Sequence, residues 1–199
     1  MEKHPRQRDK LKITFGMGET KYPDHDNTLV ISVWVANVGV KRVMVDTGSS
    51  VYMLYFDAFE KLRLTEKDLS SIASTITSFI SDFISPLGTT TLLVTIGHEP
   101  KSKIIMVTYM VVHLPSAYNV ILSCPALNKL RAIISTYHQT MKFPTRARIS
   151  EVRSDPQESK KCYLMTIMLP KKLKLELRLP NTMSKSRLDQ FDARAKPRD

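Results

Sequence analysis

The stretch Val45-Asp46-Thr47-Gly48-Ser49-Ser50 decides the fold that we expect for this chain. It follows the apolar residues Val43 and Met44, so a carboxylate stands where a strand leaves a packed core. An ionised carboxylate in that place is costly unless hydrogen bonds or a shared proton compensate. Asp and Gly also favour plain surface turns, which is the alternative. We interpret Asp46 as a catalytic acid on a tight polar turn.

The residues on both sides of this stretch favour the catalytic interpretation. Residues 29–36 alternate in hydropathy and are rich in β-branched side chains, which is typical of a strand. Asn37-Val38-Gly39 predicts a turn, and residues 40–45 predict the returning strand of a β-hairpin that leads into Asp46. After the stretch comes a short apolar run at 51–55. Residues 56–62 then carry apolar side chains at helical spacing.

The following segment is predicted to be mainly β. A helix is expected from Pro125 to about Leu130, because proline suits the first turn. Strands are expected at 72–79, 89–96, 103–112, 118–122, 132–136 and 140–143, the first two framing a long hairpin. Hairpin, strand, turn and helix occur at 29–62 and again at 89–130. The first unit contains the Asp46 turn and the second Ile121-Leu122-Ser123, so we expect two related β-units in an all-β domain.

Length and charge suggest how the chain is divided. A chain of 199 residues that is 42% hydrophobic supports one core domain with tails. We predict a flexible leader at 1–27, the core domain at 28–145 and a basic, largely irregular linker or tail at 146–199. That tail holds 14 Lys/Arg against 7 Asp/Glu, a net charge of +7 within a total of +11. It is either a solvated linker or a contact for nucleic-acid phosphates, although no zinc knuckle or RNA-recognition signature supports the second.

Other composition features argue against a membrane protein and a metal protein. No apolar run approaches the roughly 18–20 residues needed to span a bilayer, and Met1–Lys12 is too charged for a secretory signal. Cys124 and Cys162 are expected to be reduced thiols. The histidines share no ligand spacing. We therefore expect an intracellular protein, cytoplasmic or nuclear, with no membrane association, no metal and no cofactor.

The chemistry of Asp46 requires a second carboxyl group. Two carboxyl groups about 3 Å apart share one proton, so that one activates water while the other protonates the scissile carbonyl, as is known for aspartic proteases. The chain contains one Asp-Thr-Gly and no Asp-Ser-Gly. We therefore expect a homodimer in which Asp46 meets its copy. Gly48 would allow the turn, Thr47 would lock it against its equivalent, and Ser49 would donate a hydrogen bond to the outer oxygen of Asp46.

Several stretches together resemble the retropepsin-type protease of plant gypsy-type retrotransposon polyproteins, over roughly residues 11–165. The stretches that carry the resemblance are Lys41-Arg42-Val43-Met44-Val45-Asp46-Thr47-Gly48-Ser49-Ser50, Leu54-Tyr55-Phe56-Asp57-Ala58-Phe59, Pro115-Ser116-Ala117-Tyr118-Asn119-Val120-Ile121-Leu122, residues 130–138 and residues 141–145. Residues 188–198 are similar to the linker toward the reverse transcriptase. The resemblance implies half of an acid-protease β-barrel with one or two short helices, and an endopeptidase that cleaves its own polyprotein.

The chain departs from that family at two places. Where the family has Gly-Phe-x-Gly in the flap, this chain has Ser78-Phe79-Ile80-Ser81, and a non-glycine residue at positive φ costs about 1–2 kcal/mol. Where the family has glycine after the second Ile-Leu, this chain has Ser123, whose side chain would cost about 1–3 kcal/mol if the backbone packs tightly there. Two alternatives therefore stay open: a catalytically inactive, degenerate protease remnant, and a basic fragment associated with nucleic acid.

Overall fold

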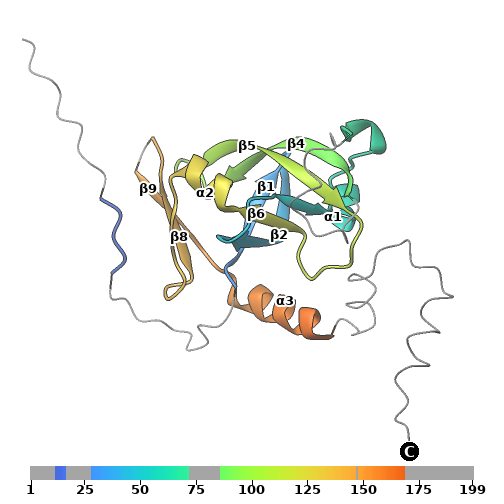
Figure 1. The fold of residues 1–199 in the computed structure, drawn as a ribbon. Coiled ribbons are helices and arrows are strands. Elements are labelled where there is room, and N and C mark those ends of the chain that lie inside the picture. Colours follow the sequence, from blue (N-terminus) through green and yellow to red (C-terminus); the bar gives the residue numbers. More distant parts are fainter. Residues whose placement is uncertain (1–11, 17–27, 72–85, 147, 169–199) are drawn as a thin grey trace, which may run out of the picture.

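The fold is mostly β, as the sequence predicts. A computed structural model describes residues 12–16, 28–71, 86–146 and 148–168, which form a closed six-stranded barrel, a separate three-stranded sheet and a few short helices (Figure 1). Going round the barrel, the strands follow the order β1 (Val30–Val35), β2 (Val38–Asp46), β6 (Val120–Ser123), β3 (Met53–Tyr55), β5 (Lys103–Val112) and β4 (Pro86–Ile96). The predicted strand at 72–79 lies outside the described residues.

The hairpin that leads into Asp46 is confirmed. Strands β1 and β2 pair antiparallel, with Val35 opposite Val38. The turn is formed by Ala36 and Asn37, which have φ values of 46° and 65°. Positive φ at both central residues is what a two-residue hairpin of the common type requires. The turn therefore comes one residue earlier than predicted, and β2 runs to Asp46 through a register shift in its pairing with β1, where Arg42 has a φ of 56°.

Strand β6 connects the two predicted β-units. It runs parallel to β2, with Asp46 opposite Ser123, and antiparallel to β3, with Met53 opposite Ile121. Each unit continues into a helix, α1 (Phe56–Lys61) after β3 and α2 (Cys124–Leu130) after β6, and a short 3₁₀ helix, η1 (Glu66–Asp68), follows α1. Pro125 lies in the first turn of α2, as predicted. The turn after β2 and the start of α2 consequently lie at the same end of the barrel.

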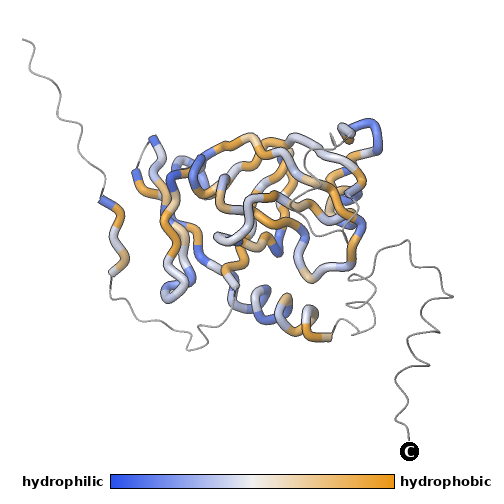
Figure 2. Tube along the Cα trace, viewed as in Figure 1, coloured by the Kyte–Doolittle hydropathy of each residue, from blue (hydrophilic) through white to orange (hydrophobic). Residues whose placement is uncertain are grey.

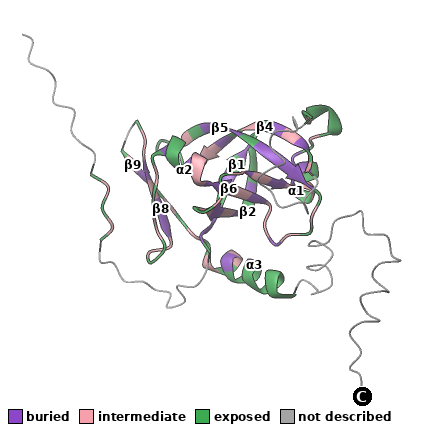
Figure 3. Cartoon of the chain, viewed as in Figure 1, coloured by how far each residue is buried: buried purple, intermediate pink, exposed green. Residues whose placement is uncertain are grey.

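Apolar side chains fill the barrel and position these strand ends. Many of the hydrophobic residues on the barrel strands are buried (Figures 2 and 3). Val43 and Val45 of β2 are buried on the same side of the strand, and Leu122 of β6 is buried beside them. Burying an aliphatic side chain stabilises a fold by about 1.5–3 kcal/mol. This packing fixes the register in which Asp46 and Ser123 are neighbours.

The prediction of a largely irregular tail from residue 146 is wrong for residues 149–168. Strand β8 (Thr140–Pro144) pairs with β7 (Ile133–Ser135) on one edge and with β9 (Ile149–Arg153) on the other. Helix α3 (Pro156–Met168) follows. A strand edge left unpaired exposes its backbone donors and acceptors, and β9 supplies partners for those of β8. Residues 169–199 lie outside the described part, and the division into domains stays a prediction.

Helix α3 is attached to the start of β1. The amide of Asp155 donates to the carbonyl of Val30 at 3.0 Å, and the hydroxyl of Ser159 donates to the carbonyl of Thr28 at 3.0 Å. Farther along the helix, Cys162 is fully buried and its thiol donates to the carbonyl of Ala117 at 3.4 Å. Within the described residues, no helix is both long and apolar enough to cross a membrane.

Candidate active site

Asp46 lies at the last position of β2, where the strand leaves the barrel. Its side chain is half-buried, while Val45 before it points into the core. The amide of Gly48 donates to the Oδ1 atom of Asp46 at 2.8 Å. A backbone amide two residues later thus orients the carboxylate. Among the described residues Asp46 forms no ion pair.

The turn after Asp46 is held from two sides. The hydroxyl of Ser49 donates to the carbonyl of Val51 and also accepts from the amide of Val51, both at 3.2 Å. The amide of Cys124 donates to the carbonyl of Ser49 at 3.0 Å, which ties the turn to the first residue of α2. The predicted hydrogen bond from Ser49 to Asp46 is therefore wrong for this structure, because Val51 takes up that hydroxyl.

Thr47 and Gly48 form the outer part of the turn. Both are exposed, so their surfaces are open to a second protein chain. Gly48 does not have a positive φ, and a Cβ atom there would meet only Oδ1 of Asp46, at 3.5 Å, an ordinary van der Waals distance. Unlike the prediction, the turn itself does not need the conformational freedom of glycine. The absence of a side chain at Gly48 instead leaves room in front of Asp46.

The backing segment Ile121, Leu122 and Ser123 forms the last part of β6. Leu122 is buried in the barrel, and Ile121 is half-buried on the other side of the strand. Ser123 is fully buried, with φ −95° and ψ 174°. This is ordinary extended backbone that any residue adopts. The backbone at Ser123 therefore does not show the strain that was expected from a serine at this position.

Two buried tyrosines lie behind the turn, and the sequence interpretation missed them. Tyr52 and Tyr109 contact each other edge to face, with ring centroids 6.1 Å apart. Burial chiefly raises the pKa of both hydroxyls above the ordinary value near 10.0, and the Cys124 thiol adds to the effect on Tyr52. Both tyrosines therefore stay neutral near neutral pH. Their positions in apolar, alternating runs identify them as core residues but not as neighbours of the turn.

The remaining predicted site residues are not placed. Ser78, Phe79, Ile80 and Ser81, the candidate flap, lie outside the described residues. Among the residues that are described, no group of three or more His, Cys, Asp and Glu side chains could hold a metal ion. Among the described residues, the predicted site residues thus come from the turn after β2 and from β6.

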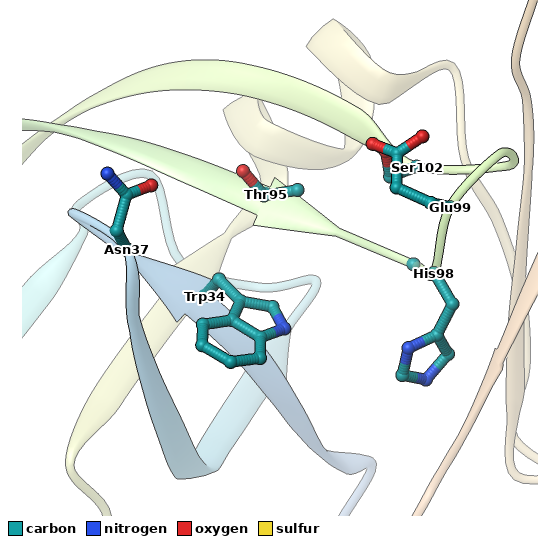
Figure 4. A pocket seen from close by; sticks show the side chains of 7 residues that line it. Trp34, Asn37, Thr95, His98, Glu99 and Ser102 are labelled. Atoms are coloured by element: carbon teal, nitrogen blue, oxygen red, sulfur yellow. The ribbon is translucent and has the colours of Figure 1, made fainter.

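A surface pocket of about 410 Å³ lies elsewhere, at the end of β4 (Figure 4). The indole of Trp34 and the imidazole of His98 line one part of it, and Glu99 accepts a 2.7 Å hydrogen bond from Ser102. Its lining contains no predicted site residue and consists of Trp34, Asn37, Thr95, Gly97, His98, Glu99 and Ser102. The pocket is therefore separate from the candidate active site.

No protein-family model and no curated protein matches the chain. Solved structures similar to it include the retroviral protease-like domain of Ddi1 from Leishmania major, at 16% identity and a TM-score of 0.48 over 65% of this chain and 95% of that one. A retropepsin-like aspartic protease from Rickettsia conorii has 21% identity and a TM-score of 0.40, over 62% and 80%. EIAV protease complexed with the inhibitor HBY-793 has 16% identity and a TM-score of 0.33, over 62% and 99%.

Proposed function

We propose that this chain is one half of a homodimeric aspartic endopeptidase whose acid is Asp46. The observation that carries the proposal is a half-buried carboxylate at the end of a core strand, oriented by the Gly48 amide at 2.8 Å. The resemblance to retropepsin-type sequences supports the same conclusion independently of the structure. The exposed Thr47 and Gly48 lie at the part of the turn that a second copy would have to approach.

The reaction follows from two such carboxylates in one site. Two unit charges about 3 Å apart repel by about 5 kcal/mol at an effective dielectric constant near 20, so the pair retains one proton. The ionised Asp46 removes a proton from water, which attacks the scissile carbonyl. The protonated Asp46 of the other copy gives its proton to the carbonyl oxygen. The Asp46 that took the water proton then gives it to the amide nitrogen, and the other Asp46 takes a proton back from a hydroxyl of the tetrahedral intermediate. The C–N bond breaks, and an amine and a carboxylic acid are released.

The substrate in this proposal is an extended polypeptide, and the sequence resemblance favours a retroelement polyprotein. An extended peptide can bind through main-chain hydrogen bonds to strands that line the site. Contacts from Ser78, Phe79, Ile80 and Ser81 to the substrate stay a prediction, as do nucleic-acid binding by residues 146–199 and an intracellular location.

The test is cleavage of a fluorogenic peptide library at mildly acidic pH by wild type and by Asp46→Asn. We expect Asp46→Asn to lose about a thousandfold or more of kcat/KM, because both general acid and general base functions need the carboxyl group. The matched control is Asp57→Asn, since Asp57 is an exposed residue of α1 and lies outside the turn. Equal cleavage by wild type and Asp46→Asn would contradict the proposal, and no cleavage by wild type would favour the inactive remnant.

A further inference from the structure

The hydroxyl of Ser123 is buried and forms no hydrogen bond with the described residues. Ser123 is fully buried, and its Oγ atom has no hydrogen-bond partner among the residues that the structure describes. A buried hydroxyl without a partner costs about 1–3 kcal/mol, and such groups in native proteins usually have a specific explanation. Ser123 therefore needs a partner that the described residues do not supply in this conformation.

Helix capping does not explain this hydroxyl. Ser123 is the residue that precedes α2, a position where a serine oxygen ordinarily accepts from an amide of the first helical turn. Here the side chain makes no such capping hydrogen bond. The helix start thus leaves the Ser123 hydroxyl free to bond elsewhere.

The nearest candidate by strand register is Asp46. Ser123 and Asp46 are direct partners in the parallel pairing of β6 with β2. Side chains of register partners on neighbouring strands point to the same face of the sheet, and the strands lie about 4.7–4.9 Å apart. A carboxylate accepts several hydrogen bonds, and Oδ1 of Asp46 has the Gly48 amide as its donor. The hydroxyls of Tyr52 and Tyr109 also lack a partner among the described residues, but only Ser123 is a register partner of Asp46. The Asp46 carboxylate can therefore accept a hydrogen bond from Ser123.

We propose that Ser123 is a positioning residue for Asp46, donating its hydroxyl hydrogen to the ionised carboxylate in the working site. The role in catalysis rests on the function proposed above. A donor to the charged form lowers the pKa of a carboxyl group, so Ser123 favours ionisation of one member of the Asp46 pair. The serine would then perform a role that glycine, the residue of the resembled family at this position, cannot perform.

Few other ionisable groups lie close enough to Asp46 to change its titration as well. Strands β1 and β6, which flank β2, carry none. On β2 itself Arg42 bonds to Asn119 and to Met165. The other ionisable groups of the elements around the turn and against β2 are Lys41, Tyr52, Tyr55, Tyr109, Cys124, Lys129, Asp155, Glu158, Lys160, Lys161, Cys162 and Tyr163. Substitution of Ser123 leaves all of them in place, so a change in the titration of Asp46 reports the lost hydroxyl.

The test is the titration of the Asp46 carboxyl carbon by NMR in the full chain, with its signal assigned by comparison with Asp46→Asn. We expect Ser123→Ala and Ser123→Gly each to raise the apparent lower pKa of Asp46 by about one unit. Ser123→Thr keeps the hydroxyl and should return the value toward wild type. Ser150→Ala removes another buried hydroxyl, on β9, and should leave the titration unchanged.

An unchanged Asp46 titration in Ser123→Ala or Ser123→Gly, with near-ultraviolet circular dichroism like wild type, would overturn the inference. Having two variants keeps the test decisive if one of them does not fold. The titration needs no turnover, so it separates the two proposals. A shifted pKa in a chain that cleaves nothing leaves the positioning contact standing without the protease function. In an active enzyme, the acidic limb of the kcat/KM profile should move upward with the same variants, and an unmoved limb contradicts the inference alone.

Discussion

Gly48 and Gly97 both lie at turns, but the structure uses the two glycines differently. At Gly48 the backbone is ordinary and a Cβ atom would be 3.5 Å from Oδ1 of Asp46. At Gly97 the φ angle is +88°, and a Cβ atom would be only 2.8 Å from the carbonyl oxygen of Lys101. The conformation of the chain therefore favours glycine at position 97, whereas at position 48 the backbone itself places no such demand.

Gly97→Ala should destabilise the fold by about 1–2 kcal/mol or more, because a side chain at positive φ adds strain to the clash with Lys101. The matched control is Gly39→Ala, where a Cβ atom would meet only the Trp34 ring at 3.9 Å. Urea unfolding followed by circular dichroism measures both variants. Equal midpoints for the two would show that the Gly97 turn relaxes without cost.

The sequence predicts a single site residue when its side-chain type alone points to a role, and it does not predict one whose role depends on the local backbone geometry. Asp46 could be found because a carboxylate directly after a buried strand has few explanations. The partner of the Ser49 hydroxyl could not, since Asp46 and Val51 are both within its reach and only the turn geometry selects Val51. Ser123 was marked for its size, but the sequence alone does not show that its hydroxyl has no partner.

At the level of elements, β9 and α3 show what the hydropathy pattern misses. Strand β9 reads Ile-Ser-Glu-Val-Arg, and Ser150 is its one buried residue, so no apolar alternation indicates it. It forms because β8 offers an edge. Helix α3 did carry a start signal: Asp155 accepts hydrogen bonds from the amides of Gln157 and Glu158, and proline opens the helix. The many Lys and Arg residues around this segment favoured the interpretation of an irregular tail instead.

The ion pairs of Glu151 make the β8–β9 pairing dependent on pH. Burial of the Glu151 carboxyl acts to raise its pKa, but hydrogen bonds from Arg153 and Lys142 outweigh burial and hold the pKa below the ordinary value of 4.5. The Glu151 carboxylate lies 2.6 Å from Arg153 and 3.1 Å from Lys142. Because the folded pKa is depressed, this stabilisation is present above pH 4.5 and is lost as the pH falls through the folded pKa.

Glu151→Gln should therefore lower the free energy of unfolding by about 0.5–1 kcal/mol at neutral pH and by nothing measurable near pH 2, since these ion pairs are partly exposed. Urea titrations at both pH values measure the difference. Glu60→Gln is the control, because Glu60 is an exposed residue of α1. A loss that persists unchanged near pH 2 would mean that packing of Glu151, not its charge, stabilises the sheet.

The packing of α3 on the barrel can be measured through Cys162. Burial, the largest influence, raises the pKa of this thiol, while Arg42 partly offsets the rise. Only the thiolate reacts with a disulfide reagent, so native Cys162 should react at least about a hundredfold more slowly than the half-buried Cys124. The variants Cys124→Ser and Cys162→Ser separate the two rates. Equal rates in the native protein would show that α3 detaches readily.

At the scale of the whole molecule, the fold places the turn that carries Asp46 at one end of a closed barrel. A closed barrel satisfies its own strand edges, so the barrel presents the Asp46 turn at one end and no free strand edge of its own. The one Asp-Thr-Gly of the chain and the exposed outer part of its turn then lead to the same requirement. In the proposed function two chains supply one carboxylate each, so the number of intact Asp46 carboxylates per dimer can be varied by experiment.

Mixing wild type with Asp46→Asn tests that requirement. If every active dimer needs two Asp46 carboxylates, random exchange gives activity proportional to the square of the wild-type fraction, because only dimers with two wild-type chains cleave. An equal mixture should retain about one quarter of the activity of the same total wild-type protein, against about one half if each chain works alone. The chains are exchanged by refolding them together from urea. An equal mixture of wild type with Asp57→Asn, refolded in the same way, should keep full activity. A linear dependence on the wild-type fraction would mean that a single Asp46 is sufficient for catalysis.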